Sequence, residues 1–275
     1  MKNRRLIDII LTAAVFIGLS AQVSSQVKEN AKEFEPVVGQ SGKDVVWVPT
    51  PQILVDSMLR LAKVSKNDFL IDLGSGDGRT VITAAKMGVR AIGIEYNPDM
   101  VELSKRNAAE EGVADKTEFI VADLFKYDFT EATVVTMFLL TDINLRLRPQ
   151  LLEMKPGTRI VSNTFSMMEW IADDTVTLDD EVSWNIAYLW IVPADVDGKW
   201  KLQEGGQLIL VQKFQMLEGE LTTPEGKRHS IEGKLNGNDI VFSAGDITYT
   251  GRVDGRKISG SSLKGSERRT WSAYR

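Results

Sequence analysis

The stretch from Phe69 to Arg79, FLIDLGSGDGR, constrains this chain more than any other. A short apolar run ends at Asp72 and Leu73, and three glycines then follow at alternate positions. Glycine tolerates left-handed backbone and lets main-chain atoms approach a ligand closely. The stretch therefore predicts a buried strand, a tight loop beside a ligand and the start of a helix.

Short apolar runs alternate with segments of helical spacing around this loop. We predict strands over 69–73, 91–95, 119–123, 134–140 and 159–162, and helices over 52–63, 80–87 and 99–112. Such alternation is typical of βαβ units, whose right-handed crossovers cover both faces of a parallel sheet. The predicted fold class is α/β with a doubly wound, mostly parallel sheet, over residues 45–196.

The composition changes near Asp197. Residues 205–265 hold eleven of the 22 glycines, between short alternating runs such as QLILVQKF and ITYTGRV. Recurring turn residues without a helical period indicate a small antiparallel β module over 197–275, either a meander or a compact sandwich. From Lys227 onward it has ten Lys and Arg against five Asp and Glu. That basic tail is either a solvated face or a docking surface for an acidic partner or membrane headgroups.

The N-terminus has the order of an export signal. Three positive side chains in MKNRR precede an apolar run from Leu6 to Ala21, and small residues follow in AQVSSQ. Residues 1–25 are therefore predicted to be a secretory signal peptide, with an uncleaved membrane anchor as the alternative. Residues 26–44 are predicted to be a linker. The predicted location is the periplasm, the exterior or the membrane, or the cytoplasm if the signal does not function.

Composition excludes several kinds of chemistry. The chain has no cysteine, and His229 is its only histidine. Cysteine nucleophiles and thiolate metal sites are therefore excluded, and a Ser-His-Asp triad or a histidine-rich zinc site is not expected. No metal site is predicted. The formal net charge of −5 argues against a general nucleic-acid partner, which requires a basic surface.

An acidic residue lies at the end of each of three successive predicted strands: Asp72, Glu95 and Asp123. Carboxyl ends of parallel strands meet at one edge of a sheet, where ligands bind. Position 79 is Arg, whereas the dinucleotide fingerprint needs glycine there. S-adenosylmethionine (SAM) fits better, because it offers an ammonium and a sulfonium, a ribose diol and an adenine amine to these three acids. The predicted cofactor-binding residues are Asp72, Gly74, Ser75, Gly76, Asp77, Gly78, Glu95, Tyr96, Asn97, Asp123 and Leu124.

The segments DLGSGDGR, IEYN, ADLF and LLEMKPGTRIV resemble the motifs of class I SAM-dependent methyltransferases, across residues 48–192. VPTP at 48–51 and the F-x-M-x-x-W spacing from Phe165 to Trp170 resemble a narrower bacterial group. That group is similar to the mitochondrial lysine methyltransferases that act on the adenine nucleotide carrier and on the c subunit of ATP synthase. The resemblance implies a Rossmann-like methyltransferase fold, with Trp47, Thr50 and Pro51 over the cofactor and Thr50 among its ligands.

The acceptor implied by the resemblance is an amine such as a protein lysine, with a small molecule as the alternative. No motif identifies a catalytic base, and Phe138, Trp170 and Trp190 either line an acceptor pocket or belong to the core. Where this group often has His-Asp-Phe-Asp, residues 163–166 read Asn-Thr-Phe-Ser. Because SAM is made in the cytosol, the export signal leaves open a second hypothesis, an exported non-catalytic protein whose β module engages a partner.

Overall fold

The computed structural model describes residues 34–179 and 183–275, and residues 36–275 form one compact unit. The predicted signal segment, residues 1–25, lies outside the described residues. Among the helices that are described, none combines the length and the apolar character needed to cross a bilayer.

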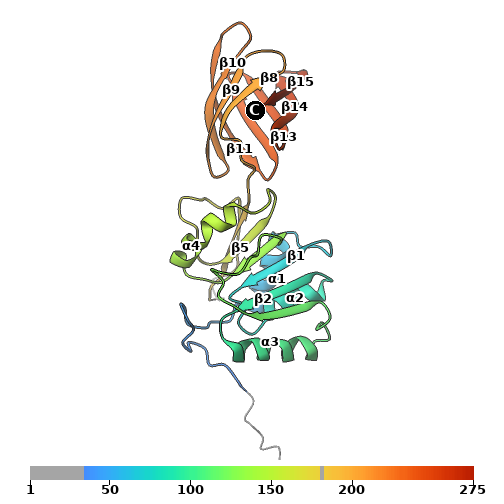
Figure 1. Cartoon of the computed structure of the whole chain (residues 1–275), viewed down its shortest axis with the longest axis vertical. Helices are drawn as coiled ribbons and strands as arrows, with labels where there is room; N and C mark the ends of the chain where they lie inside the picture. Colours follow the sequence, from blue (N-terminus) through green and yellow to red (C-terminus); the bar gives the residue numbers. More distant parts are fainter. Residues whose placement is uncertain (1–33, 180–182) are drawn as a thin grey trace, which may run out of the picture. The chain divides into compact units, whose positions relative to one another are not determined.

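A seven-stranded sheet dominates the N-terminal part of this unit (Figure 1). Its strand order is β3-β2-β1-β4-β5-β7-β6, and the strands β1 to β5 are parallel. The strands are β1 (Phe69–Leu73), β2 (Arg90–Glu95), β3 (Thr117–Val121), β4 (Val134–Met137), β5 (Arg159–Asn163), β6 (Asp174–Thr177) and β7 (Ile186–Ile191). The order reverses between β1 and β4, where doubly wound sheets bind ligands. The predicted fold class is confirmed.

Helices cover both faces of this sheet, so its strands are buried on both sides. The helices are α1 (Gln52–Leu61), α2 (Arg79–Lys86), α3 (Pro98–Glu110) and α4 (Thr141–Leu152). Apolar residues of α1, α2 and α3 form one core cluster, and those of α4 join a second. Neighbouring residues of β1 point to opposite faces of the sheet, so that Leu70 belongs to the first cluster and Ile71 to the second.

Two features of the sheet differ from the sequence prediction. The strand predicted over 134–140 ends at Met137, so that Phe138 to Leu140 leave the sheet before α4 begins. The strands β6 and β7 were not predicted, and β7 pairs antiparallel with both β5 and β6. Their pairing joins residues far apart in sequence, whereas short-range periodicity reports only local preference.

The C-terminal β module is a closed antiparallel barrel of eight strands. These are β8 (Gly198–Leu202), β9 (Gln207–Lys213), β10 (Met216–Thr222), β11 (Arg228–Asn236), β12 (Asp239–Ala244), β13 (Ile247–Asp254), β14 (Lys257–Lys264) and β15 (Glu267–Tyr274). Trp200, Phe242 and Trp271 fill its interior with smaller apolar side chains. Closure comes from a short pairing of β15 with β8, Ala273 with Leu202 and Tyr274 with Lys201.

Candidate functional site: a pocket at the carboxyl ends of the parallel strands

The glycine loop after β1 adopts the backbone that its sequence requires. Gly74, Gly76 and Gly78 have φ values of 77°, 55° and 82°, in the left-handed region that favours glycine. Gly78 is the N-cap of α2, so the loop turns directly from strand into helix. A side chain at Gly76 would lie 2.7 Å from Nε1 of Trp47, because the segment before α1 passes close above the loop.

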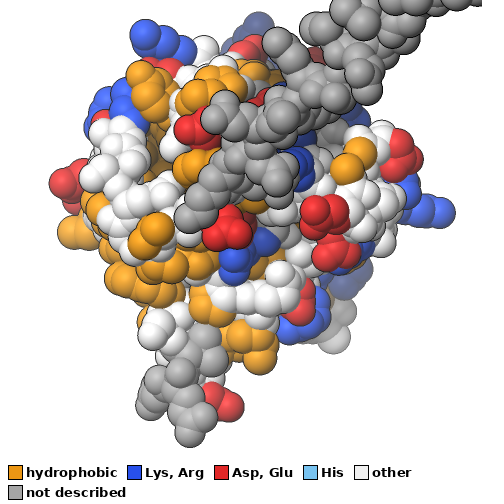
Figure 2. Space-filling view, turned by 90° about the horizontal axis from the view of Figure 1, so that it is seen from below, with side chains coloured by type: hydrophobic (Ala, Val, Ile, Leu, Met, Phe, Trp, Pro, Cys, Tyr) orange, Lys and Arg blue, Asp and Glu red, His pale blue; other side chains and the backbone are white. Residues whose placement is uncertain are grey.

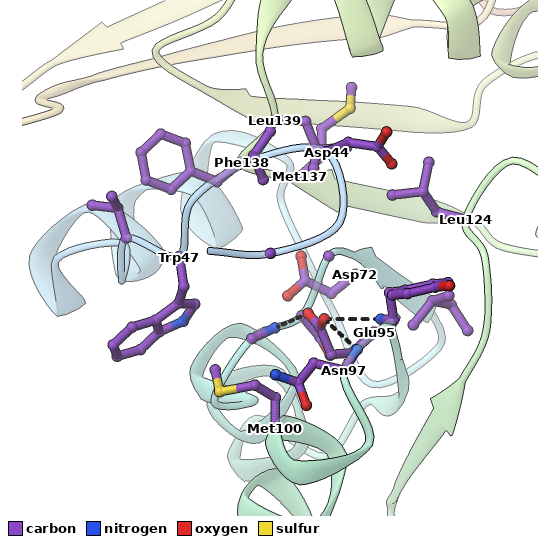
Figure 3. A pocket seen from close by; sticks show the side chains of 18 of the residues that line it. Asp44, Trp47, Asp72, Glu95, Asn97, Met100, Leu124, Met137, Phe138 and Leu139 are labelled. Carbon is purple, nitrogen blue, oxygen red and sulfur yellow. Dashed lines mark hydrogen bonds between the residues drawn. The ribbon is translucent and has the colours of Figure 1, made fainter. Parts of the chain in front are cut away.

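One pocket gathers almost every predicted site residue. Its lining includes Thr50, Asp72, Gly74, Ser75, Gly76, Asp77, Glu95, Tyr96, Asn97, Asp123 and Leu124. Figure 3 labels Asp72, Glu95, Asn97 and Leu124 among them. Gly78 is the exception among the predicted residues. A β-carbon there would lie 2.8 Å from the Phe119 ring and 2.9 Å from Cβ of Ser104. Gly78 therefore allows close packing of the loop against β3 and α3, instead of facing the pocket.

Asp72 is the most perturbed carboxyl of the pocket. Its side chain is buried, and Oδ1 accepts a hydrogen bond of 2.6 Å from Oγ1 of Thr136. Burial raises its pKa to about 7, and the nearby negative charges of Asp77 and Glu95 act in the same direction, against the hydrogen bond from Thr136. A buried carboxylate without a cationic partner favours an incoming positive charge.

Glu95, at the end of β2, is held by the backbone of two loops (Figure 3). Oε2 accepts from the amide of Gly76 at 3.0 Å, and Oε1 accepts from the amides of Tyr96 and Asn97 at 2.8 and 2.9 Å. A carboxylate has about four acceptor sites, so capacity for about one more hydrogen bond remains. Binding both hydroxyls of a ribose therefore requires Glu95 to exchange one of its backbone contacts.

Asp123 lies two residues beyond β3 and is paired with Lys43. Nζ of Lys43 is 2.8 Å from Oδ2 of Asp123 and 4.8 Å from the centre of the Tyr96 ring. The pKa of Asp123 is lowered chiefly by this hydrogen bond, and that of Lys43 is raised. Residues 40–44, which the sequence predicts to be the end of a linker, line the pocket instead. An adenine amine at Asp123 therefore competes with Lys43.

Arg79 ties the glycine loop to the segment that precedes α1. Its Nη2 contacts Oδ2 of Asp77 at 2.5 Å, and its Nη1 donates to the carbonyl of Thr50 at 2.8 Å. Trp47 and Thr50 line the pocket, as expected of a covering segment, whereas Pro51 does not. These contacts fix the covering segment relative to the loop.

The three aromatic candidates for an acceptor pocket lie in two different environments. Phe138 lines the pocket, directly after β4. Trp170 and Trp190 are fully buried in the second core cluster, where Nε1 of Trp190 donates to the carbonyl of Trp170. Sequence reasoning missed Phe165 and Trp184 as lining residues. Only the F-x-M-x-x-W spacing pointed to Phe165, and no sequence signal pointed to Trp184.

The chemistry of this pocket fits a cationic nucleoside. It combines a buried carboxylate, a backbone-held carboxylate after the next strand, and a glycine loop whose Ser75 hydroxyl has no partner among the described residues. No cluster of His, Cys, Asp and Glu able to hold a metal occurs in the described ranges. Fold and site together define a class I SAM-dependent methyltransferase.

Comparison with known proteins supports this class of protein. Residues 72–174 match the model of the ANTKMT methyltransferase domain. A protein-lysine N-methyltransferase of Saccharolobus islandicus is 42% identical over 151 residues, which are 54% of this chain and 94% of that protein. A lysine N-methyltransferase of Xenopus laevis, named for the c subunit of ATP synthase, is 35% identical over 46% of this chain and 56% of its own length. This chain thus spans about half the length of that animal relative.

A solved structure is also similar. The crystal structure of an RNA methyltransferase from Salinibacter ruber in complex with S-adenosyl-L-homocysteine has 49% sequence identity and a TM-score of 0.52. The match covers 54% of this chain and 96% of that one. The chain belongs to the same family as the protein-lysine N-methyltransferase of Saccharolobus islandicus. It is a SAM-dependent methyltransferase, so the predictions of an enzyme and of its cofactor are confirmed.

Proposed function

We propose that this enzyme methylates the side-chain amine of a protein lysine. The observation that carries the proposal is the 42% identity to a protein-lysine N-methyltransferase over 94% of that protein's length. The lysine methyltransferase from Xenopus laevis, 35% identical over 128 residues, adds support.

The residues that hold SAM in this proposal are those that line the carboxylate side of the pocket. Asp72 and the glycine loop face its cationic part, Glu95 takes a ribose hydroxyl, and Asp123 takes the adenine amine. Bound SAM supplies an electrophilic methyl group, which the lone pair of the lysine amine attacks as the carbon–sulfur bond breaks and its electrons pass to sulfur. The protein must therefore orient the amine and present it without its proton.

The acidic side chains of the pocket are already engaged. Asp77 pairs with Arg79, Asp123 and Asp44 with Lys43, and Glu95 with backbone amides. Asp72 is buried beside Thr136. Among the lining residues none of these carboxylates is a free base. Phe138, Leu139 and Leu140, which follow β4, make their side of the pocket apolar.

We propose that desolvation on this apolar side lowers the pKa of the acceptor amine, so that the neutral form reaches the site.

RNA is the second candidate acceptor, because the Salinibacter ruber structure is named as an RNA methyltransferase. Affinity for RNA rests largely on contacts of Lys and Arg with phosphates. The formal net charge here is −5, and on the face in Figure 2 acidic and basic side chains intermingle outside the grey atoms. Both observations favour a protein or small-molecule acceptor.

The acceptor is tested by comparing strains with and without the gene. We expect mass spectrometry of membrane and envelope proteins to find a lysine that carries methyl groups only when the gene is present. Purified enzyme with labelled SAM should restore the label to extracts of the deletion strain, and protease but not ribonuclease should remove it. Label that ribonuclease removes would favour RNA and contradict the proposal.

We also propose that the chain is exported. The support is the order of charged, apolar and small residues in 1–25. Cell fractionation followed by N-terminal sequencing should find a mature chain that begins near Gln22 or Gln26 outside the inner membrane. An intact Met1 on a cytosolic chain would contradict export.

A further inference from the structure

Three aromatic side chains in contact with one another form a continuous wall of the pocket. We call Phe138, Phe165 and Trp184 the aromatic wall. Their ring centres are 6.0 Å apart for Phe138 and Phe165, 5.7 Å for Phe138 and Trp184, and 5.9 Å for Phe165 and Trp184. All three line the pocket.

The strand order separates this wall from the acids. Asp72 and Glu95 lie at the carboxyl ends of β1 and β2, and Asp123 follows β3. Phe138 and Phe165 follow β4 and β5. Since the order is β3-β2-β1-β4-β5, acids and rings lie on opposite sides of the reversal between β1 and β4. The two sides of one pocket therefore have different chemistry, and the proposed function assigns the acids to the cofactor.

The backbone holds the wall at a conformational cost. Trp184 has a φ of 57°, and Thr164, directly before Phe165, has a φ of 60°. Bulky and β-branched residues rarely adopt the left-handed region, and such outliers persist where function requires them. The carbonyl of Phe165 is also fixed by the Ser162 hydroxyl at 2.8 Å and the Asn144 amide at 3.0 Å.

Core packing does not explain Trp184, because 41% of its surface is exposed. Its partners Phe138 and Phe165 are only half-buried. In the described part of the chain, each Lys or Arg that lies over a ring does so at a ring outside the aromatic wall. The wall therefore presents π faces that none of those cations covers.

We propose that the aromatic wall binds the methylated ammonium of the acceptor lysine by cation–π attraction; this rests on the proposed function. Ring faces attract cations within about 6 Å, and a methylated ammonium loses less hydration than an unmethylated one. The wall thus retains an acceptor that already carries a methyl group. Once this ammonium has released its proton to solvent, the neutral amine can be methylated again. Neutral acceptors of the same shape gain only the apolar contact.

A pair of matched peptides tests this charge preference. One carries trimethyllysine, and the other carries its neutral isostere, in which a quaternary carbon replaces the nitrogen. Calorimetric titration of each into the full-length protein saturated with S-adenosylhomocysteine should show binding of the charged peptide several-fold tighter than that of the neutral one. Trp184→Leu should abolish the difference, whereas Trp184→Phe should keep part of it.

Tyr274→Leu is the matched control, because Tyr274 is also 41% exposed but lies on β15 of the barrel. It should leave the charge preference unchanged, and all variants should bind S-adenosylhomocysteine like wild type, which shows that they are folded. Equal affinities for the two peptides, or no binding of the charged one, would overturn the inference and leave the methyltransferase assignment intact. Wild-type protein that fails to bind S-adenosylhomocysteine would count against the proposed function instead.

A single-stranded RNA oligonucleotide completes the test, since bases also stack on aromatic rings. The inference expects the oligonucleotide to bind Trp184→Leu and wild type alike. Binding that Trp184→Leu weakens, in a protein without a charge preference between the peptides, would overturn the inference and assign the wall to bases.

Discussion

Replacing Glu95 with alanine should weaken SAM binding by about tenfold to a hundredfold, because charge-assisted hydrogen bonds are worth about 1.5–3 kcal/mol. The substitution removes the proposed ribose acceptor, and it also releases the amides of Gly76, Tyr96 and Asn97 that the carboxylate now holds. Loss of those contacts loosens the glycine loop relative to β2. Calorimetric titration with SAM and with S-adenosylhomocysteine measures the effect.

Two further variants make this result specific. Glu95→Gln keeps the shape of the side chain but loses its charge, so its affinity should fall between those of wild type and Glu95→Ala. Glu102→Ala is the control, because this exposed glutamate of α3 pairs with Lys105 and does not line the pocket. Affinity that stays unchanged in Glu95→Ala would remove the assignment of the β2 end to the ribose.

SAM affinity should rise as the pH increases through about 7, the value to which burial raises the pKa of Asp72. A cationic ligand favours the ionised carboxylate, so binding at lower pH must first release a proton. Below pH 7 the affinity should fall by up to about tenfold per pH unit for one linked proton. Titrations at several pH values, in buffers of different ionisation enthalpy, measure the affinity and the protons released.

Asp72→Asn should flatten this pH dependence and lower the affinity at high pH, since no carboxylate is left to ionise. Asparagine retains an oxygen that can accept from Thr136, so the substitution preserves the hydrogen bond seen at Asp72. A pH dependence that survives in Asp72→Asn would show that another group titrates.

In the ligand-free protein, Asp72 makes folding stability depend on pH in the opposite direction, so that stability falls as the pH rises. Because the folded pKa of Asp72 lies above the ordinary value of 3.8, folding favours its protonated form. Its contribution to stability is fully present below about pH 4 and is lost as the pH rises through about 7. Asp72→Asn should therefore raise the melting temperature relative to wild type at about pH 8 more than at about pH 5. Thermal unfolding without ligand measures this difference.

Local patterns carried the prediction of the fold and of the cofactor side of the site. The alternation of short apolar runs with helical segments is a property of neighbouring residues, and it led to the parallel sheet. Once strands are parallel, their carboxyl ends share one edge, so an acid at or just beyond the end of each of three strands was enough to place Asp72, Glu95 and Asp123 around one pocket. The left-handed φ of Gly74 and Gly76 likewise follows from residue type.

Long-range contacts account for what sequence reasoning missed. Lys43 meets Asp123 across 80 positions, Trp184 meets Phe138 across 46, and β15 closes onto β8. The periodicity of a sequence does not show which distant segments pack together. For the same reason, the strand predicted to continue to Leu140 stops at Met137. Phe138 and Leu139 are apolar because they line the pocket, and they are not part of the sheet.

The sequence by itself therefore determined the sheet, the glycine loop and the identity of the acids, because each depends on residue type and on spacing along the chain. Only the tertiary structure decided the pKa of Asp72, the pairing of Lys43 with Asp123 and the assembly of the aromatic wall. Burial and through-space distance set these properties, and both arise when segments remote in sequence pack together.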